Sequence, residues 1–314
     1  MAYCALFRAP FAVFLALLGL SSPAKADEPL QEPRGAPPPD ATALVSVPKF
    51  TEDAPTVERP MEAAVGSLAA GGQLATGNSR MIALTANGTM DARFGRNGVG
   101  LSFVGNYGES ASPGNALVVT AENAQARARY DRFVIEDAGF FLVSTLRHDR
   151  FQGLEWRYNL DPGFKYLLSK SERSSVWLEA GYDFQGDVRR DDARILRDAR
   201  GSPVLGAAML QKTVTDHSTR VFLGAKHAFN KEVSVSTGVE YLQSFVDPSR
   251  YRVNYDLLFS ANVGKRLAVG LGFSARYDHV PLPNKQDLDT ATTVSLIYSY
   301  SNAPDVAAEN GRQR

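Results

Sequence analysis

The residues of this chain that could do chemistry are charged side chains that recur at every second position. In the segment 154–168, for example, Glu155, Arg157 and Lys165 share one parity. A β-strand projects successive side chains to opposite faces, so residues of one parity lie on one face. The same spacing in other segments extends this charged face to a set of both signs: Arg127, Arg129, Glu155, Arg157, Asp161, Lys165, Glu179, Asp183, Arg220, Lys226, Glu240, Asp256 and Arg276.

Two functions suit such a face if the strands close into a tube. Opposite charges can pair across the interior and hold the shape of the tube, because unpaired ions away from water are costly. Alternatively, they can line a narrow polar channel for small solutes or ions. Barrels of about eight strands are filled by their own side chains, whereas about 16–18 strands leave a channel. We predict the salt-bridged interior and keep the channel as the alternative.

Three histidines form the second group of candidates. His148, His217 and His279 fall near the expected ends of strands, where lipid head groups would lie. A histidine paired with a serine or a carboxylate there would suit a hydrolase that modifies lipid A, which is the third function considered. The chain has no Gly-x-Ser-x-Gly or His-Glu-x-x-His motif, and these motifs mark the common hydrolase sites. We therefore predict that the protein is not an enzyme and has no catalytic residue, metal site or cofactor.

A third candidate is a long connection, 189–216, that is rich in arginine. Guanidinium groups bind phosphates bidentately, so this segment predicts a contact with lipopolysaccharide. The arginines concerned are Arg189, Arg190, Arg194, Arg197 and Arg200. Three aspartates, Asp191, Asp192 and Asp198, dilute the charge. A solvated loop is therefore the alternative interpretation.

The elements that position these residues are strands with an apolar face opposite the charged one. The alternating segments run to about 11 residues or more, the length that a tilted strand needs to cross a bilayer, whereas strands of soluble proteins have about 5–6 residues. Aromatic residues lie near the expected strand ends, as an interfacial girdle requires: Tyr107, Trp177, Tyr241, Tyr277 and Tyr300. Pro162 cannot donate a ladder hydrogen bond and predicts a bulge.

The alternation predicts an all-β fold, an antiparallel up-and-down transmembrane β-barrel of about 12 strands. The expected strands are 67–76, 79–94, 97–108, 122–133, 138–149, 154–168, 175–188, 217–229, 232–245, 252–263, 267–278 and 290–301. Most connections alternate between short and long, which is typical of barrels with short periplasmic turns and longer external loops. An even number of strands places both termini in the periplasm.

The segments outside the barrel differ in composition. Residues 1–26 contain Arg8, an apolar run and Ala24-Lys25-Ala26, which predicts a cleaved signal peptide. Residues 27–64 are rich in proline and predict a disordered periplasmic leader. The barrel is expected over 65–301, and 302–314 form a polar tail. The only cysteine, Cys4, lies in the signal segment, so the mature chain would lack disulfides and thiolate sites.

Charge and location limit the partners. The formal net charge is +0, which gives no electrostatic basis for nucleic-acid binding. A secreted barrel would reside in the outer membrane, with lipid and lipopolysaccharide as partners. The last expected strand carries an alternating row, Val294, Leu296, Tyr298 and Tyr300, similar to the terminal signal that the barrel-assembly machinery recognises.

Several stretches resemble the family of salt-induced outer-membrane proteins, a domain of unknown function. They are 71–79 with its Thr-Gly-Asn-Ser turn, 129–133, 148–158, 163–168 and 178–182. The resemblance covers about 67–301 and implies an outer-membrane barrel, but it supplies no catalytic or binding residues. We therefore expect a barrel with a structural or envelope-stress role.

Overall fold

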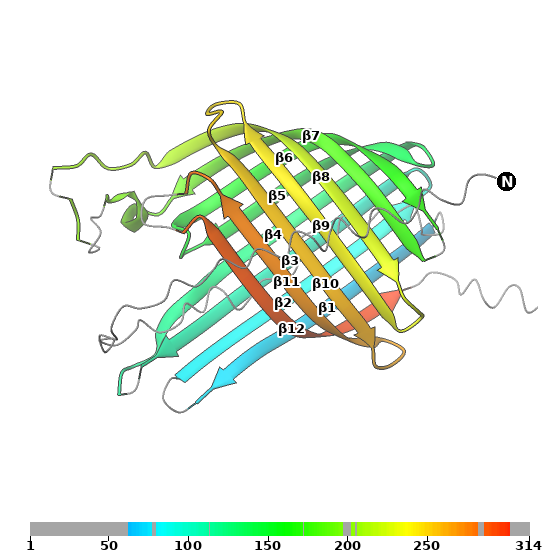
Figure 1. Ribbon diagram of the computed structural model, residues 1–314, viewed down its shortest axis with the longest axis horizontal. Helices are drawn as coiled ribbons and strands as arrows, with labels where there is room; N and C mark the ends of the chain where they lie inside the picture. Colours follow the sequence, from blue (N-terminus) through cyan, green and yellow to red (C-terminus); the bar gives the residue numbers. More distant parts are fainter. Residues whose placement is uncertain are drawn as a thin grey trace, which may run out of the picture. The chain divides into compact units, whose positions relative to one another are not determined.

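The computed structural model describes residues 62–76, 80–112, 114–171, 173–196, 202–204, 206–281 and 286–301. Twelve strands in this part of the chain form one closed antiparallel sheet, in which each strand pairs with its neighbours in sequence and the last pairs with the first (Figure 1). Their bounds are β1 Glu62–Ala75, β2 Arg80–Phe94, β3 Asn97–Ala111, β4 Val118–Ile135, β5 Ala138–Asp149, β6 Leu154–Lys170, β7 Ser174–Arg189, β8 Thr213–Ala228, β9 Val233–Ser244, β10 Tyr251–Asn262, β11 Leu267–Asp278 and β12 Leu288–Ser301. The prediction of an all-β, up-and-down barrel of about 12 strands is confirmed.

The barrel is apolar outside and charged inside. On the outer face, Leu84 is 56% exposed and Phe103 is 52% exposed, whereas the inward Glu179 and Asp256 are 0% exposed. A soluble protein buries its leucines and exposes its carboxylates, so this arrangement is the reverse of a soluble core. No helix in the described part of the chain is long and apolar enough to cross a membrane.

Most of the expected aromatic girdle lies on the outer face. Tyr107, Tyr241 and Tyr300 are each exposed by 40% or more. Trp177 contradicts the prediction, because its side chain is fully buried inside the barrel. It occupies the same parity as Glu179 on β7, so its position in the period-two pattern, rather than its residue type, determines the face on which it lies.

The two ends of the barrel differ in their connections. We call one the short-turn end, which carries both ends of the described sheet and the turns 95–96, 136–137, 171–173, 229–232 and 263–266. The other is the long-loop end, which carries among others the connections 190–212, 245–250 and 279–287. The longest of these begins with a short 3-10 helix, η5 (Asp191–Arg194).

The expected bulge at Pro162 is absent. The register between β6 and β7 is the same at Leu160↔Phe184 and at Gly163↔Gly181, and Pro162 itself pairs with Leu142 on β5. The register shifts of β6 against β7 lie instead between Leu154 and Trp156 and between Leu167 and Ser169. The β6–β7 pairing skips Asp161 and Pro162 and resumes in the same register, so the missing donor of Pro162 interrupts the ladder locally without producing a bulge.

Several expectations fall outside the described residues. These are the signal peptide at 1–26, nearly all of the leader at 27–64, the tail at 302–314, and Arg197 and Arg200 of the long loop. Strand β1 begins at Glu62, three residues before the expected start of the barrel.

Among the described residues, the junction between β1 and β12 has the fewest pairs in the sheet. It pairs six positions, from Val65↔Ser301 to Ala70↔Leu296, whereas β1 and β2 pair at fourteen. Just beyond the last pair, a Cβ added to Gly71 would lie 2.4 Å from the carbonyl oxygen of Val294. The two strands therefore approach too closely here for any side chain larger than hydrogen.

We expect Gly71→Val to destabilise closure of the barrel by about 1–3 kcal/mol, the usual cost of overpacking. Samples of the refolded protein in SDS are held at increasing temperatures before electrophoresis. The measurement is the fraction that still migrates as a folded barrel at each temperature. Gly105→Val is the matched control, because nothing lies within 4 Å of a Cβ at that outward position. Equal melting of the two variants would contradict the close approach at the β1–β12 junction.

Candidate functional site

The centre of the barrel interior is a chain of ion pairs, which we call the central ion chain. Arg129 on β4 donates to Glu179 on β7 at 2.7 Å. The second carboxylate oxygen of Glu179 accepts a hydrogen bond from Arg220 on β8 at 2.9 Å. Arg220 in turn donates through Nε to Glu240 on β9 at 2.7 Å. The chain thus connects strands that are three apart in the sheet order, and Arg129 therefore reaches across the concave inner face.

The central ion chain is almost completely buried. The side chains of Glu179 and Arg220 are 0% and 1% exposed, and that of Glu240 is 4% exposed. Arg129 also makes two hydrogen bonds of 2.8 Å to Asp131, on its own strand. Buried charges repay their desolvation only with good geometry and further hydrogen bonds, and this network provides both.

An aromatic group lies beside the ion chain toward the short-turn end. Phe133, Leu167, Trp177 and Phe222 form a buried cluster inside the barrel. The indole ring of Trp177 covers Gly224 on β8, where an added Cβ would lie 2.2 Å from the ring. A separate ring, Phe141, lies 4.8 Å from the guanidinium carbon of Arg129 and 5.5 Å from that of Arg220. Apolar side chains therefore fill part of the interior that alternation alone predicts to be polar.

A cavity of about 530 Å³ occupies the lumen on the other side of the ion chain. Arg220 and Glu240 line its inner part, and Asp278 and Asp287 line it near the long-loop end. We call this cavity the vestibule. Its walls come from strands around the barrel and carry both arginines and carboxylates.

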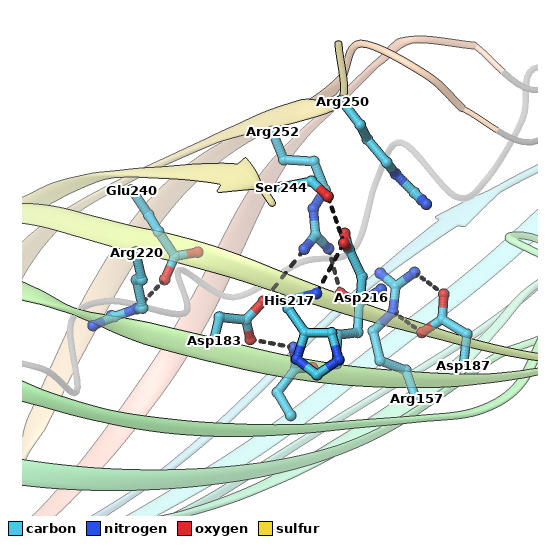
Figure 2. Close-up of polar contacts among 12 residues, drawn as sticks. Arg157, Asp183, Asp187, Asp216, His217, Arg220, Glu240, Ser244, Arg250 and Arg252 are labelled. Carbon is cyan, nitrogen blue, oxygen red and sulfur yellow. Dashed lines mark hydrogen bonds and ion pairs between the residues drawn. The ribbon is translucent and has the colours of Figure 1, made fainter. Parts of the chain in front are cut away.

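Ion pairs also bind the walls of the vestibule together. Arg157 makes a bidentate pair with Asp187, at 2.7 and 2.6 Å. Arg252 on β10 reaches Gln185 and Asp183 on β7, a second contact that spans three strands (Figure 2).

The remaining charged residues of the sequence prediction are placed as follows. Arg276 pairs with Asp256 at 2.7 Å, and Lys165 with Asp131 at 3.4 Å. Arg127 and Asp161 are both buried on the inward parity of β4 and β6.

Two predicted residues lie outside this network. The carboxylate of Glu155 is 48% exposed and pairs with Arg190 of the long loop at 3.6 Å. The register shift between Leu154 and Trp156 turns Glu155 away from the lumen. Lys226 keeps the inward parity but is exposed, near the short-turn end of β8.

The interior also holds charged residues that the sequence prediction left out of the face. Asp131 shares the parity of Arg129, and Arg252 shares that of Asp256. Arg147 shares the parity of Thr145 and pairs with Asp149 at 2.6 Å. Following each parity to the end of its strand would have found them. No sequence pattern indicates that Arg250, in the connection before β10, lines the vestibule.

The loop arginines do not form one cluster. Arg189 ends β7 and lines the vestibule. Arg190 pairs with Glu155 and with Asp192 at 3.2 Å, and Arg194 pairs with Asp191 at 3.0 Å. The hydrogen bond from Arg194 and the nearby charge of Lys212 lower the pKa of Asp191 below its ordinary value. Carboxylates of the same loop therefore neutralise the two arginines that face away from the lumen.

The three histidines lie on the outer face at the long-loop end, each against an aromatic ring. His148 is 5.6 Å from Trp156, His217 is 5.2 Å from Phe184, and His279 stacks on Tyr251 at 4.6 Å. Within the described ranges, no three His, Cys, Asp or Glu side chains are grouped so as to hold a metal ion. That the protein is not an enzyme stays a prediction.

We expect Glu179→Ala to lower the free energy of unfolding by about 3–5 kcal/mol, because it leaves two buried guanidiniums without their shared partner. Urea unfolding in detergent micelles, followed by tryptophan fluorescence, measures this. The control is Glu155→Ala, which breaks an exposed pair worth about 0–1 kcal/mol. If both variants unfold at the same urea concentration, the central ion chain does not stabilise the barrel.

Several solved structures of outer-membrane proteins are similar to this chain. An outer membrane channel from Pseudomonas putida F1 is 10% identical, over 78% of this chain and 99% of the channel, with a TM-score of 0.44. The translocator domain of the autotransporter NalP from Neisseria meningitidis is 10% identical over 76% of this chain and 87% of that one, with a TM-score of 0.38. A KdgM porin in complex with disordered oligogalacturonate is 10% identical over 76% of this chain and 99% of the porin, with a TM-score of 0.38.

A search of the curated proteins finds no match. A family model matches residues 68–300, which span nearly the whole barrel. The chain therefore belongs to the family described as "Protein of unknown function, DUF481".

Proposed function

We propose that the protein is an integral outer-membrane barrel with a structural or envelope-stress role, whose lumen is closed by ion pairs. The observation that carries this proposal is the burial of the central ion chain. Glu179 is 0% exposed although it faces the inside of a barrel, which means that neighbouring side chains, rather than an open water column, surround it. A stress-related role, including induction by salt, has its support in the resemblance of the sequence.

The outer membrane is the location that the surface supports. Leucine, valine and aromatic side chains cover the outer face, and in water an apolar patch of this extent would drive aggregation. A closed sheet also satisfies its own backbone, as hydrocarbon requires. We place the short-turn end and both termini in the periplasm, following the general arrangement of such barrels.

Two partners belong to the same proposal. The alternating row of β12 faces outward, with Val294 63% and Tyr300 53% exposed, and it would present the signal that the barrel-assembly machinery reads. Lipid and lipopolysaccharide would contact the outer face. For the loop arginines, the exposed pairs of Arg190 and Arg194 with aspartates favour a solvated loop over a phosphate-binding one.

A narrow polar channel is the second candidate, and the vestibule favours it. A cavity of about 530 Å³ lined by charged groups could conduct if a path continued past the ion chain to the short-turn end. The two candidates differ in one observable, the conductance of the purified protein.

We expect the wild-type protein to insert into planar bilayers without stepwise current openings, because the central ion chain closes the lumen. The double variant Glu179→Ala, Arg220→Ala removes both central partners and should show stepwise openings. Gel mobility checks that this double variant folds, and Glu155→Ala is the control variant that should stay closed. Regular openings from wild-type protein would reject the closed lumen and establish the channel.

A further inference from the structure

We propose that the vestibule contains a binding site for a small solute that carries an oxyanion, either a phosphate or a carboxylate. The site consists of Arg189 and Arg250, supported by Arg157 and Arg252. It lies at the long-loop end of the lumen, and it goes beyond the proposed function because it can bind whether or not the lumen conducts.

Four arginines from separate parts of the wall line this one cavity. Arg157 lies on β6, Arg189 ends β7, Arg250 precedes β10 and Arg252 lies on β10, and all four line the vestibule. Figure 2 shows Arg157 on one side, and Arg252 with the adjacent Arg250 on the other. Arg157 and Arg250 both lie close enough to Arg252 to repel it. Guanidinium groups gathered in this way are characteristic of sites that bind phosphate or carboxylate.

The four arginines differ in how far the protein satisfies them. Arg157 is held by its bidentate pair with Asp187, through Nε and Nη2, and Arg252 reaches Gln185 and Asp183 through Nη1 and Nη2. These contacts hold both side chains in place in the wall, where they supply positive charge.

Arg189 and Arg250 keep donors available. In the described part of the chain, Arg189 makes one long hydrogen bond, 3.4 Å to the carbonyl oxygen of Gln211. Among the described residues, Arg250 has one ion pair, to Asp278 at 3.9 Å, which is too long for a hydrogen bond. Its Nε is buried and finds no hydrogen-bond partner within this part of the chain. Buried donors of a native protein usually have a partner, so an oxyanion that accepts from both guanidiniums would complete the site.

The vestibule as a whole is close to charge balance, because seven arginines and eight carboxylates line it. The case for an anion therefore rests on the available donors of Arg189 and Arg250, and on the nearby carboxylates being engaged by other groups. Asp183 and Asp187 are already committed to Asn159, Arg252 and Arg157. Further out, Asp149 is paired with Arg147, so it does not compete for Arg189 or Arg250.

The size of the vestibule suits a solute larger than the ion alone. Ligand pockets usually measure about 300–1,000 Å³, and about 530 Å³ lies within that range. The polar walls would accept hydroxyl groups as well as the oxyanion. A phosphorylated or acidic monosaccharide has both properties.

The test is titration calorimetry of the refolded protein in detergent micelles, with glucose 6-phosphate and glucuronate as separate probes and glucose as the uncharged reference. We expect one or both anions to bind and glucose to bind at least about tenfold more weakly, the effect of losing charge-assisted hydrogen bonds. The two anions distinguish a phosphate site from a carboxylate site.

Three variants locate the site. The double variant Arg189→Gln, Arg250→Gln should weaken anion binding at least about tenfold. The double variant Arg189→Lys, Arg250→Lys should retain part of the binding affinity, because lysine keeps the charge but loses the bidentate geometry. Arg190→Gln is the matched control, since this neighbour of Arg189 faces the loop carboxylates instead of the lumen.

Folding of each variant is checked by running unheated samples on an SDS gel, where a folded barrel migrates differently from the unfolded chain. Binding that is equal in wild type and in the double glutamine variant would overturn the site. So would the absence of heat from every probe at millimolar concentration, or equal binding of glucose and the two anions. None of these outcomes depends on conductance. Calorimetry can therefore reject the anion site without rejecting the closed lumen, and conductance can reject the closed lumen without rejecting the anion site.

Discussion

The carboxylate of Glu179 receives hydrogen bonds from two arginines on opposite sides of it, and the rest of the interior is arranged around this contact. Because Arg129 comes from β4 and Arg220 from β8, the contact holds the curved wall between them at a fixed spacing. Phe141 lies beside both guanidiniums, and Asp131 and Glu240 accept further hydrogen bonds from Arg129 and Arg220. In a tube with lipid outside, the interior is the one place where charged side chains can be satisfied, and pairing makes their burial tolerable.

Alternation in the sequence was sufficient to predict the barrel and which face most residues occupy. Long strands with leucine and aromatic residues on one parity and charge on the other have few other stable arrangements. Trp177 has the parity of the inward Glu179, so alternation gives its face correctly, and only its residue type suggested the girdle. Gly224 on the neighbouring strand leaves room for the indole. Glu155 departs from the alternation because the register shift at the start of β6 turns it outward, and the period-two pattern does not reveal where such a shift falls.

The contacts across the lumen lie beyond what a single sequence can indicate. Arg129 and Glu179, or Arg252 and Gln185, are on strands that do not pair, so neither register nor spacing brings them together. Closure of the sheet and the lengths of the side chains determine these partners. The vestibule arises from the same cause: it lies where the ion pairs leave the lumen unfilled, and residues such as Arg250 reach it from a connection without regular alternation.

The short β1–β12 junction has a consequence for the order in which the molecule forms. It joins the segments that are most distant in the described sheet, so its closure costs the most chain entropy, and the described residues form six pairs there, fewer than at the other junctions. The central ion chain lies on β4 to β9 and does not involve either strand of the junction. A folding intermediate can therefore assemble the charged interior as a curved open sheet, with joining of the first and last strands as the final and slowest event.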